Sequence, residues 1–257
     1  PIALNTKEAG ALKELADKHK VNLMVGHVLL FHPAIIKIKE LIDSGKIGKL
    51  EYIYSNRLNL GTVRTEENIL WSFAPHDISI FEYFIGSNPV EVVSRGGAFL
   101  TPGIHDTTMT SLTYPNNVVG HIFVSWLHPF KEHRMVMIGS KGMISFEDSS
   151  AEKDILYYEK GIDWVQGEPI KRDGPTEVIP YDKGFPLTNE IQYFIDHLDG
   201  SKLGIADGQN AFDVLEVLEK ATHSLQGIKA DDNSETPASE SDFFVHPTSE
   251  VDAGVTV

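Results

Sequence analysis

Five short segments typical of β-strands follow one another between residues 90 and 146, and this run constrains the fold more than any other feature of the chain. They are residues 90–99, 106–114, 118–127, 134–138 and 143–146, and weaker candidates follow at 155–158 and 178–180. Pro115-Asn-Asn117 and Gly139-Ser-Lys-Gly142 between them are signals for tight hairpin turns. The sequence therefore predicts an α+β fold with an open, mostly antiparallel sheet.

Helical patterns surround this run and supply the layer that the sheet needs on one of its faces. We expect helices at residues 6–20, 33–41, 187–198 and 209–225, and a further strand at 50–59. Because these helices cover one face, something else must cover the other. A second copy of the chain is the natural candidate, so the sequence predicts a homo-oligomer through the open sheet face.

His76 is the strongest candidate for chemistry. It stands just before an apolar run, 78–85, which ends at Gly86, so we expect a short helix that begins here with Asp77 in its first turn. The positive end of a helix dipole disfavours imidazolium, and a neutral imidazole can accept a proton as a general base. The alternative is a histidine that only caps or packs against the start of the helix.

The first 26 residues are expected to be the end of a dinucleotide-binding domain. Asn5 or Thr6 can cap a helix, and residues 21–25 then form a short buried strand, as in half of a βαβ unit. The chain carries no G-x-G-x-x-G fingerprint of its own. We therefore interpret the chain as an internal fragment, inactive by itself, of a longer protein.

The remaining domain boundaries follow from composition. Residues 27–228 are expected to form the α+β domain for substrate binding and oligomerisation, and the Ser-, Pro- and acid-rich residues 229–243 form a linker. Residues 244–257 resemble the entry coil of a left-handed β-helix acyltransferase of the hexapeptide-repeat type, although such a fold needs several coils to bury its core.

Charge and composition exclude several classes of partner. The formal charge of −15 argues against nucleic acid as a main partner. No apolar run is long enough to cross a bilayer, no secretory signal is present and cysteine is absent, which together predict a cytoplasmic protein without membrane attachment. His27 with His32, and His121 with His128, lack the spacing of metal ligands, so no metal is expected.

Several motifs agree with one family. Three segments resemble parts of the glucose–fructose oxidoreductase / inositol dehydrogenase (Gfo/Idh/MocA) family. They are Pro1-Ile-Ala-Leu-Asn-Thr-Lys-Glu-Ala9, Ser44-Gly-Lys-Ile-Gly-Lys-Leu50 and Ile138-Gly-Ser-Lys-Gly-Met-Ile144. Three further segments resemble a narrower branch of this family, the UDP-N-acetylglucosamine-uronate 3-dehydrogenases of surface-polysaccharide synthesis. They are residues 55–61 (Ser-Asn-Arg-Leu-Asn-Leu-Gly), 70–77 (Leu-Trp-Ser-Phe-Ala-Pro-His-Asp) and 123–131 (Phe-Val-Ser-Trp-Leu-His-Pro-Phe-Lys). The resemblance extends over about residues 1 to 228.

The resemblance implies a dehydrogenase that passes a hydride from a secondary alcohol of a nucleotide sugar, the C3 hydroxyl of a UDP-N-acetylglucosamine uronate, to NAD or NADP. His76 would be the base, alone or with a family lysine that would stand directly before Pro1, and Pro1 would lie on the cofactor side. Ser72 departs from the pattern, because many members carry an aspartate four residues before the histidine.

Such a substrate carries a diphosphate and a carboxylate, which require cations and hydrogen-bond donors. Arg57, Arg64 and Lys131 are candidate anion ligands, and Asn59 and Asn68 are candidate donors, unless they are solvated surface groups. Two further candidates are His27, at the end of an expected strand, and Trp71, which could stack on a sugar or base. Each has a structural alternative as a packed core residue.

Two other functions stay open at this stage. The chain could belong to a bifunctional protein whose chief activity is that of a hexapeptide-repeat N-acetyltransferase, or it could be a non-catalytic oligomerisation module. The first alternative would require further hexapeptide repeats after residue 257.

Overall fold

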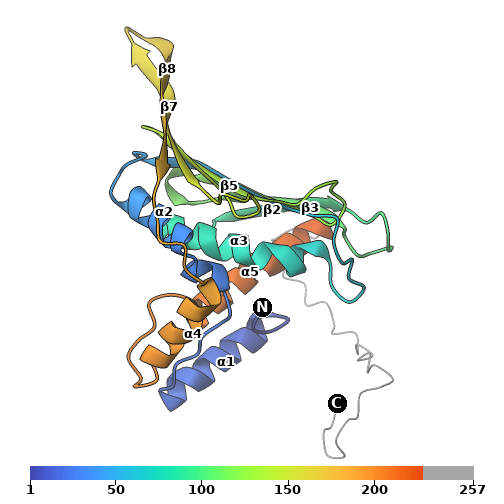
Figure 1. Ribbon diagram of the computed structural model, residues 1–257. Helices are drawn as coiled ribbons and strands as arrows, with labels where there is room; N and C mark the ends of the chain where they lie inside the picture. Colours follow the sequence, from blue (N-terminus) through green and yellow to red (C-terminus); the bar gives the residue numbers. More distant parts are fainter. Residues whose placement is uncertain (228–257) are drawn as a thin grey trace, which may run out of the picture.

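The computed structural model describes residues 1–227, which are built around one eight-stranded sheet in the order β2-β3-β4-β1-β5-β6-β7-β8 (Figure 1). All neighbouring strands are antiparallel except β1 and β4, which run parallel. The predicted α+β fold with an open, mostly antiparallel sheet is therefore confirmed. The strands are β1 (Leu50–Leu58), β2 (Glu91–Gly97), β3 (Thr107–Thr113), β4 (Val119–Ser125), β5 (Glu132–Gly139), β6 (Met143–Glu147), β7 (Ile155–Val165) and β8 (Glu168–Ile179).

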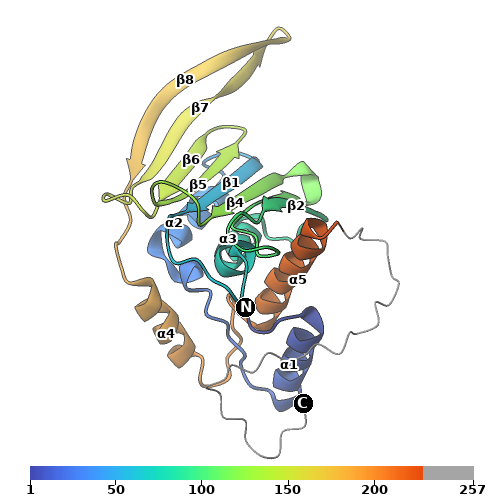
Figure 2. The same ribbon diagram turned by 90° about the vertical axis from the view of Figure 1, so that its right-hand side faces the viewer.

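Five α-helices and two short 3₁₀ turns, η1 and η2, accompany the sheet in the described residues. Figures 1 and 2 show α2, α3 and α5 against one face of the sheet, with α1 and α4 farther from it. The helices begin and end close to the predicted positions, apart from α3, which begins earlier. Their bounds are α1 (Thr6–His19), η1 (Val28–Phe31), α2 (Pro33–Asp43), α3 (Ile69–Ile85), η2 (Pro115–Asn117), α4 (Pro186–Asp196) and α5 (Gly208–Leu225).

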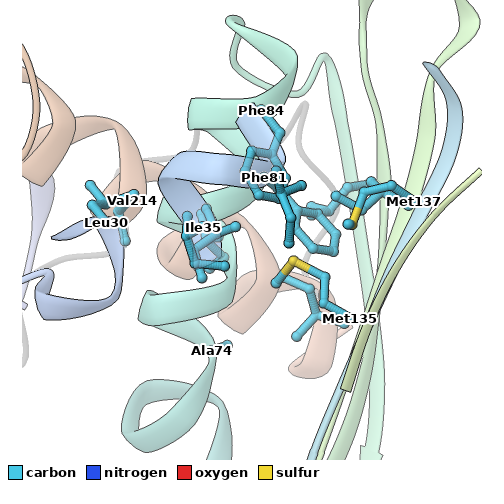
Figure 3. Close-up of a cluster of buried hydrophobic side chains, with 14 of the residues drawn as sticks. Leu30, Ile35, Ala74, Phe81, Phe84, Met135, Met137 and Val214 are labelled. Atoms are coloured by element: carbon cyan, nitrogen blue, oxygen red, sulfur yellow. The ribbon is translucent and has the colours of Figure 1, made fainter. Parts of the chain in front are cut away.

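The hydrophobic core lies between the sheet and these helices. Alternate residues of β1 and β5, such as Ile53 and Met137, point into it, as the two-residue period of a strand requires. Phe81 of α3 points toward Met137 from the helical layer, and Ile35 of α2 belongs to the same buried cluster (Figure 3). Burial of this apolar surface fixes α3 against the strands and so fixes the residues that α3 carries.

The other face of the central strands carries no helix. Tyr54 of β1 stacks on His121 of β4, and the Tyr52 hydroxyl is hydrogen-bonded to the same imidazole. Val136 and Tyr158 lie on this face as well and line an open hollow of about 620 Å³. We call this surface, carried by β4, β1, β5, β6 and the first part of β7, the open face.

The hairpin of β7 and β8 is much longer than the sequence indicated. Strands were predicted only at 155–158 and 178–180, whereas the two strands pair as far as a turn at Gln166 and Gly167, both with positive φ. The added residues are mostly polar or exposed, so they lack the apolar alternation that reveals a half-buried strand. The hairpin projects beyond the helical layer (Figure 1).

The strand predicted at residues 21–25 is not formed. Only Met24 makes an isolated antiparallel bridge, to Asp207, and Val21 is exposed. A buried parallel strand needs neighbours on both sides, and the described residues provide none for this segment. The helix before it is present, and its cap is Asn5, one of the two predicted candidates. The assignment of residues 1–26 to a dinucleotide-binding domain stays a prediction. The linker and acyltransferase predictions fall on residues 229–257, outside the described part.

Candidate active site

α3 carries the predicted catalytic residue, but the helix begins seven residues earlier than predicted. Asn68 is the N-cap, and its side chain accepts a hydrogen bond from the backbone N–H of Trp71. His76 therefore lies in the interior of α3, directly after Pro75. The prediction that His76 starts the helix is wrong, because the proline inside the segment made the first two turns resemble a loop. A dipole effect at a helix start thus cannot be what keeps this imidazole neutral.

Burial keeps His76 neutral instead. The side chain is partly exposed, its Nδ1 atom is buried without a hydrogen-bond partner among the described residues, and desolvation together with the charge of Arg57 lowers its pKa to about 4. Asp77 acts in the opposite direction. At neutral pH the imidazole therefore carries no charge and has a lone pair available, which is the protonation state that a proton acceptor requires.

A buried ion pair lies beside His76. The Arg57 guanidinium of β1 donates from Nε and Nη2 to the two carboxylate oxygens of Asp77, at 2.7 and 3.0 Å. The Nη1 atom of Arg57 lies 3.5 Å from Nδ1 of His133 on β5. Burial, Arg57 and Lys131 lower the pKa of His133 to about 4. Arg57 thus joins α3 to the sheet, and the carboxylate that pairs with it is that of Asp77.

His27 approaches the same place from the segment before η1. Its side chain is buried, and Nδ1 lies 2.8 Å from Oδ1 of Asn210 in the first turn of α5. Burial lowers the pKa of His27, and the charge of His27 in turn contributes to the lowered pKa of His76. The two imidazoles of His27 and His76 are therefore within electrostatic reach of each other.

Pro1, Asn68 and Trp71 line a hollow of about 580 Å³ between the first residues of the chain, the loop before α3 and the 103–104 turn. Two of these side chains are already engaged. Asn68 caps α3, and the indole N–H of Trp71 donates to the Thr222 hydroxyl of α5 at 2.9 Å. Trp71 thus presents one edge to α5, and its ring contributes to the wall of the hollow.

The other predicted ligands lie farther out. Arg64 pairs with Glu67 at 3.1 Å and is more than half exposed. Lys131 is exposed, and Asn59 is partly exposed at the end of β1, where its backbone N–H donates to the Ser125 carbonyl. The structure therefore brings His76, Arg57 and His27 together, whereas Pro1 lines the hollow with Asn68 and Trp71, and Arg64 and Asn59 lie outside both groups.

Three residues near this site were not singled out from the sequence. Glu82 and Asn210 form a buried pair next to His27, and His133 faces Arg57 across the strands. Only Glu82 left a signal, since it is a single acidic residue inside the apolar run that ends at Gly86. Nothing in the sequence around His133 or Asn210 distinguishes these residues from other residues of a strand or a helix.

Two general properties can be stated for residues 1–227. They contain no cluster of three or more histidine, aspartate or glutamate side chains placed to bind a metal ion. None of their helices has both the length and the apolar character needed to cross a membrane.

Comparisons with known proteins give one matching family model and several similar proteins. Residues 35–145 match the model of the GFO/IDH/MocA C-terminal domain. UDP-N-acetylglucosamine 3-dehydrogenase of Acidithiobacillus ferrooxidans is 26% identical over 215 residues, which are 81% of this chain and 64% of that protein. A solved structure of the same enzyme has a TM-score of 0.75 at 23% identity and covers 89% of this chain and 70% of its own.

A second solved structure, an inositol dehydrogenase homologue of Azotobacter vinelandii complexed with NAD⁺, has a TM-score of 0.74 at 14% identity, over 88% of this chain and 69% of that one. At these identities the structural likeness shows a shared fold. The chain spans 47 and 64% of the length of the first two curated relatives. Residues 35–145 are therefore similar to a GFO/IDH/MocA C-terminal domain, and the described residues share the fold of these solved structures.

Proposed function

We propose that this chain supplies the substrate-binding and proton-accepting half of an NAD(P)-dependent dehydrogenase that oxidises a secondary alcohol of a nucleotide sugar. The observation that carries the proposal is the neutral imidazole of His76, which has a buried and unpartnered Nδ1 atom and polar neighbours. A histidine that only packs in the core would be fully enclosed, whereas the His76 side chain is partly exposed and lies beside the Arg57–Asp77 ion pair.

The chemistry follows from the atoms that His76 offers. Oxidation of an alcohol to a ketone releases a proton from oxygen and a hydride from carbon. When bound, the nicotinamide supplies the acceptor for the hydride. His76 takes the hydroxyl proton, and Asp77 favours the imidazolium that results, because its negative charge raises the pKa of His76. The Arg57 cation, whose charge acts on His76, would also favour negative charge that develops on an oxygen bound beside this imidazole.

The cofactor would be NAD or NADP, held largely by polypeptide other than the described residues. The chain has no glycine-rich dinucleotide loop. What the described residues do offer is an uncovered apolar surface on the side away from the sheet. Exposed residues include Leu12 and Leu15 of α1, and Leu187, Ile191 and Ile195 of α4. We propose that a dinucleotide-binding domain covers these faces and completes the hollow beside Pro1.

The substrate class rests on charge and on the relative. The protein from Acidithiobacillus ferrooxidans is named for UDP-N-acetylglucosamine, which carries a diphosphate. Arg64 and Lys131, the exposed cations next to the site, would bind the phosphates or a uronate carboxylate, with Asn59 as a donor. We propose a UDP-N-acetylamino sugar or its uronate as the substrate, in the synthesis of surface polysaccharide in the cytoplasm.

Replacement of His76 by asparagine in the full-length gene product tests this function. Asparagine preserves polarity but cannot take up a proton, so turnover with UDP-N-acetylglucosamine or its uronate and NAD⁺ should fall at least about 100-fold. Formation of reduced nicotinamide measures the rate. His223→Asn, an exposed histidine of α5, is the matched control and should leave the rate unchanged. Wild-type turnover in His76→Asn would remove His76 from the mechanism.

A non-catalytic role in oligomerisation is the second candidate, and the open face favours it. Aromatic and apolar side chains remain uncovered on five strands, which is unusual for a sheet in a monomer. The two functions are compatible, because a dehydrogenase can assemble through this face. A gene product that self-associates but never reduces NAD⁺ or NADP⁺ with any UDP-sugar would leave oligomerisation as the function.

A further inference from the structure

We propose that Asn210, anchored by Glu82, holds the His27 imidazole in the tautomer that carries its proton on Nδ1, so that Nε2 is an acceptor for a substrate hydroxyl. This role of Nε2 rests on the proposed function, whereas the tautomer is a property of the chain itself. Asn210 and Glu82 are then positioning residues, since they act through His27.

The contacts define the direction of each hydrogen bond. Nδ2 of Asn210 donates to Oε2 of Glu82 at 3.3 Å, which places the amide oxygen of Asn210 2.8 Å from Nδ1 of His27. An amide oxygen can only accept, so Nδ1 of His27 must carry the proton. In a neutral imidazole the other nitrogen is then unprotonated.

The charges around Asn210 favour this orientation of its amide. Burial raises the pKa of Glu82 to about 9, and the charges of Asp213 and Glu216 on α5 act in the same direction. Their negative charge attracts the positive NH₂ end of the Asn210 amide toward Glu82 and turns the oxygen toward His27. A protonated Glu82 keeps the same contact only with its proton on Oε1, which is buried without a hydrogen-bond partner among the described residues, so the orientation of the Asn210 amide is the point that the experiment must decide.

The network is rigid because three elements meet in it. Glu82 is 7% exposed and lies near the end of α3, and Asn210 is fixed in α5 by a bond from its backbone N–H to Oδ1 of Asp207. His27 is held in the backbone segment that bonds to Ala206 through Val25. The described residues provide no hydrogen-bond partner for Nε2 of His27. That atom is therefore pre-oriented, and no described residue occupies its lone pair.

A flipped amide is the competing arrangement, and it predicts the opposite tautomer. If Glu82 donated its proton to the oxygen of Asn210, the NH₂ group would face His27 and Nδ1 would have to accept. The proton of His27 would then lie on Nε2, and this atom would be a donor toward the substrate. The two arrangements differ in the protonation of two ring nitrogens, which ¹⁵N NMR distinguishes directly.

The experiment is a long-range ¹H–¹⁵N correlation spectrum of the 257-residue chain with ¹⁵N-labelled histidine at neutral pH. His27→Gln identifies the resonances of His27. We expect an unprotonated Nε2 and a protonated Nδ1, which resonate far apart. A wild-type spectrum with the proton of His27 on Nε2 would overturn the proposal, and no variant would then be needed.

Variants then test whether Asn210 sets the tautomer. Asn210→Leu should shift the tautomer population of His27 away from Nδ1–H, whereas Asn210→Asp, which can only accept, should keep it. Gln209→Leu, an exposed residue in the same helical turn, is the control and should leave the spectrum unchanged. Glu82→Leu should reproduce the effect of Asn210→Leu, and Glu82→Gln should restore the wild-type spectrum. Unchanged tautomers in both leucine variants would contradict the role of the network.

Kinetics separates this proposal from the function it rests on. In the full-length gene product, Asn210→Leu should raise KM for the sugar about tenfold and change kcat less, because His27 binds substrate while His76 takes the proton. If no dehydrogenase activity exists, the tautomer measurement still stands. If activity is present and KM is unchanged, only the role of Nε2 in binding fails.

Discussion

Two arginine–carboxylate pairs lie at neighbouring positions on opposite faces of the same sheet, and they differ in almost every physical respect. Arg57 is opposite His133 in the β1–β5 ladder and points toward the helices, where its partner is Asp77. One position away, Arg134 points to the open face and pairs with Glu147 of β6 at 2.8 Å. The side chains of the first pair are 12 and 2% exposed, and those of the second are 44 and 28% exposed.

The difference shows which face can hold a precise site. A buried pair has no water to replace a lost partner, so its geometry is fixed and its loss is costly. An exposed pair exchanges with water and contributes little to stability. The covered face of the sheet therefore pre-orients His76 and His27, whereas the open face tolerates change and suits association with another surface.

The largest effect is expected from Arg57→Ala. Removal of the guanidinium leaves the Asp77 carboxylate buried and unpaired, which should lower the free energy of unfolding by about 3–5 kcal/mol. Urea titration followed by circular dichroism measures the loss. The double variant Arg57→Met/Asp77→Leu should recover most of it, because no unpaired charge remains. A single-variant loss below about 1 kcal/mol would mean that the two faces do not differ in this way.

The next effect concerns Glu82, whose pKa of about 9 in the folded protein lies above that of an unfolded glutamate. The folded state therefore binds the proton more tightly, so the stabilising effect is complete at low pH and is lost as the pH rises from about 4.5 toward 9. The slope should approach about 1.4 kcal/mol per pH unit.

Glu82→Gln should remove this slope and make the chain more stable than wild type at pH 8. Urea titrations at pH 5, 6.5 and 8 provide the measurement, and Glu14→Gln, an exposed residue of α1, is the control. Identical slopes in wild type and Glu82→Gln would show that Glu82 is ionised in the fold, with its charge balanced by other groups.

Arg134→Ala tests the other side of the comparison. The exposed pair of Arg134 with Glu147 should contribute less than about 1 kcal/mol, since both side chains regain water when the pair is lost. The buried Glu132 carboxylate, 3.6 Å from Arg134, keeps its hydrogen bond from the Asn56 side chain in this variant. The same urea titration as for Arg57→Ala applies, at low protein concentration so that association does not contribute. A loss as large as that of Arg57→Ala would contradict the proposed contrast.

Local patterns predicted the parts of this molecule in which each residue's neighbours lie nearby in the sequence. The strands between residues 90 and 146, their turns and the caps at Asn5 and Gly86 follow from alternation and turn chemistry, and the structure confirms them. Pro75 hid the first turns of α3, because proline usually marks a helix start.

The network around the site depends on distant partners and could not be derived from local patterns. Asp77 meets Arg57 across 20 residues of sequence, and Glu82 meets Asn210 across 128. Nothing in the sequence near Arg57 distinguishes an anion ligand from the partner of a buried aspartate. The role of Arg57 as a substrate ligand stays a prediction, and two of its donors are already used by Asp77.

The smallest effect on stability is expected at the end of the β7–β8 hairpin. Trp164 is 71% exposed, and Trp164→Ser should change the free energy of unfolding by less than about 0.5 kcal/mol, since an exposed side chain loses little on truncation. By the alternation of β7, positions 158, 160, 162 and 164 lie on one side of the strand, so Ile162 and Trp164 continue the open face beyond Tyr158.

If copies of the chain associate through that face, Trp164→Ser should weaken the association several-fold while the fold stays intact. Sedimentation velocity over a range of concentrations measures this effect, and Val165→Ser, on the opposite side of the strand, is the matched control. Equal association in both variants would confine the interface to the central strands. A large loss of stability in Trp164→Ser alone would show instead that the hairpin packs within its own chain. The open face, which tolerates change, would then extend only as far as β6.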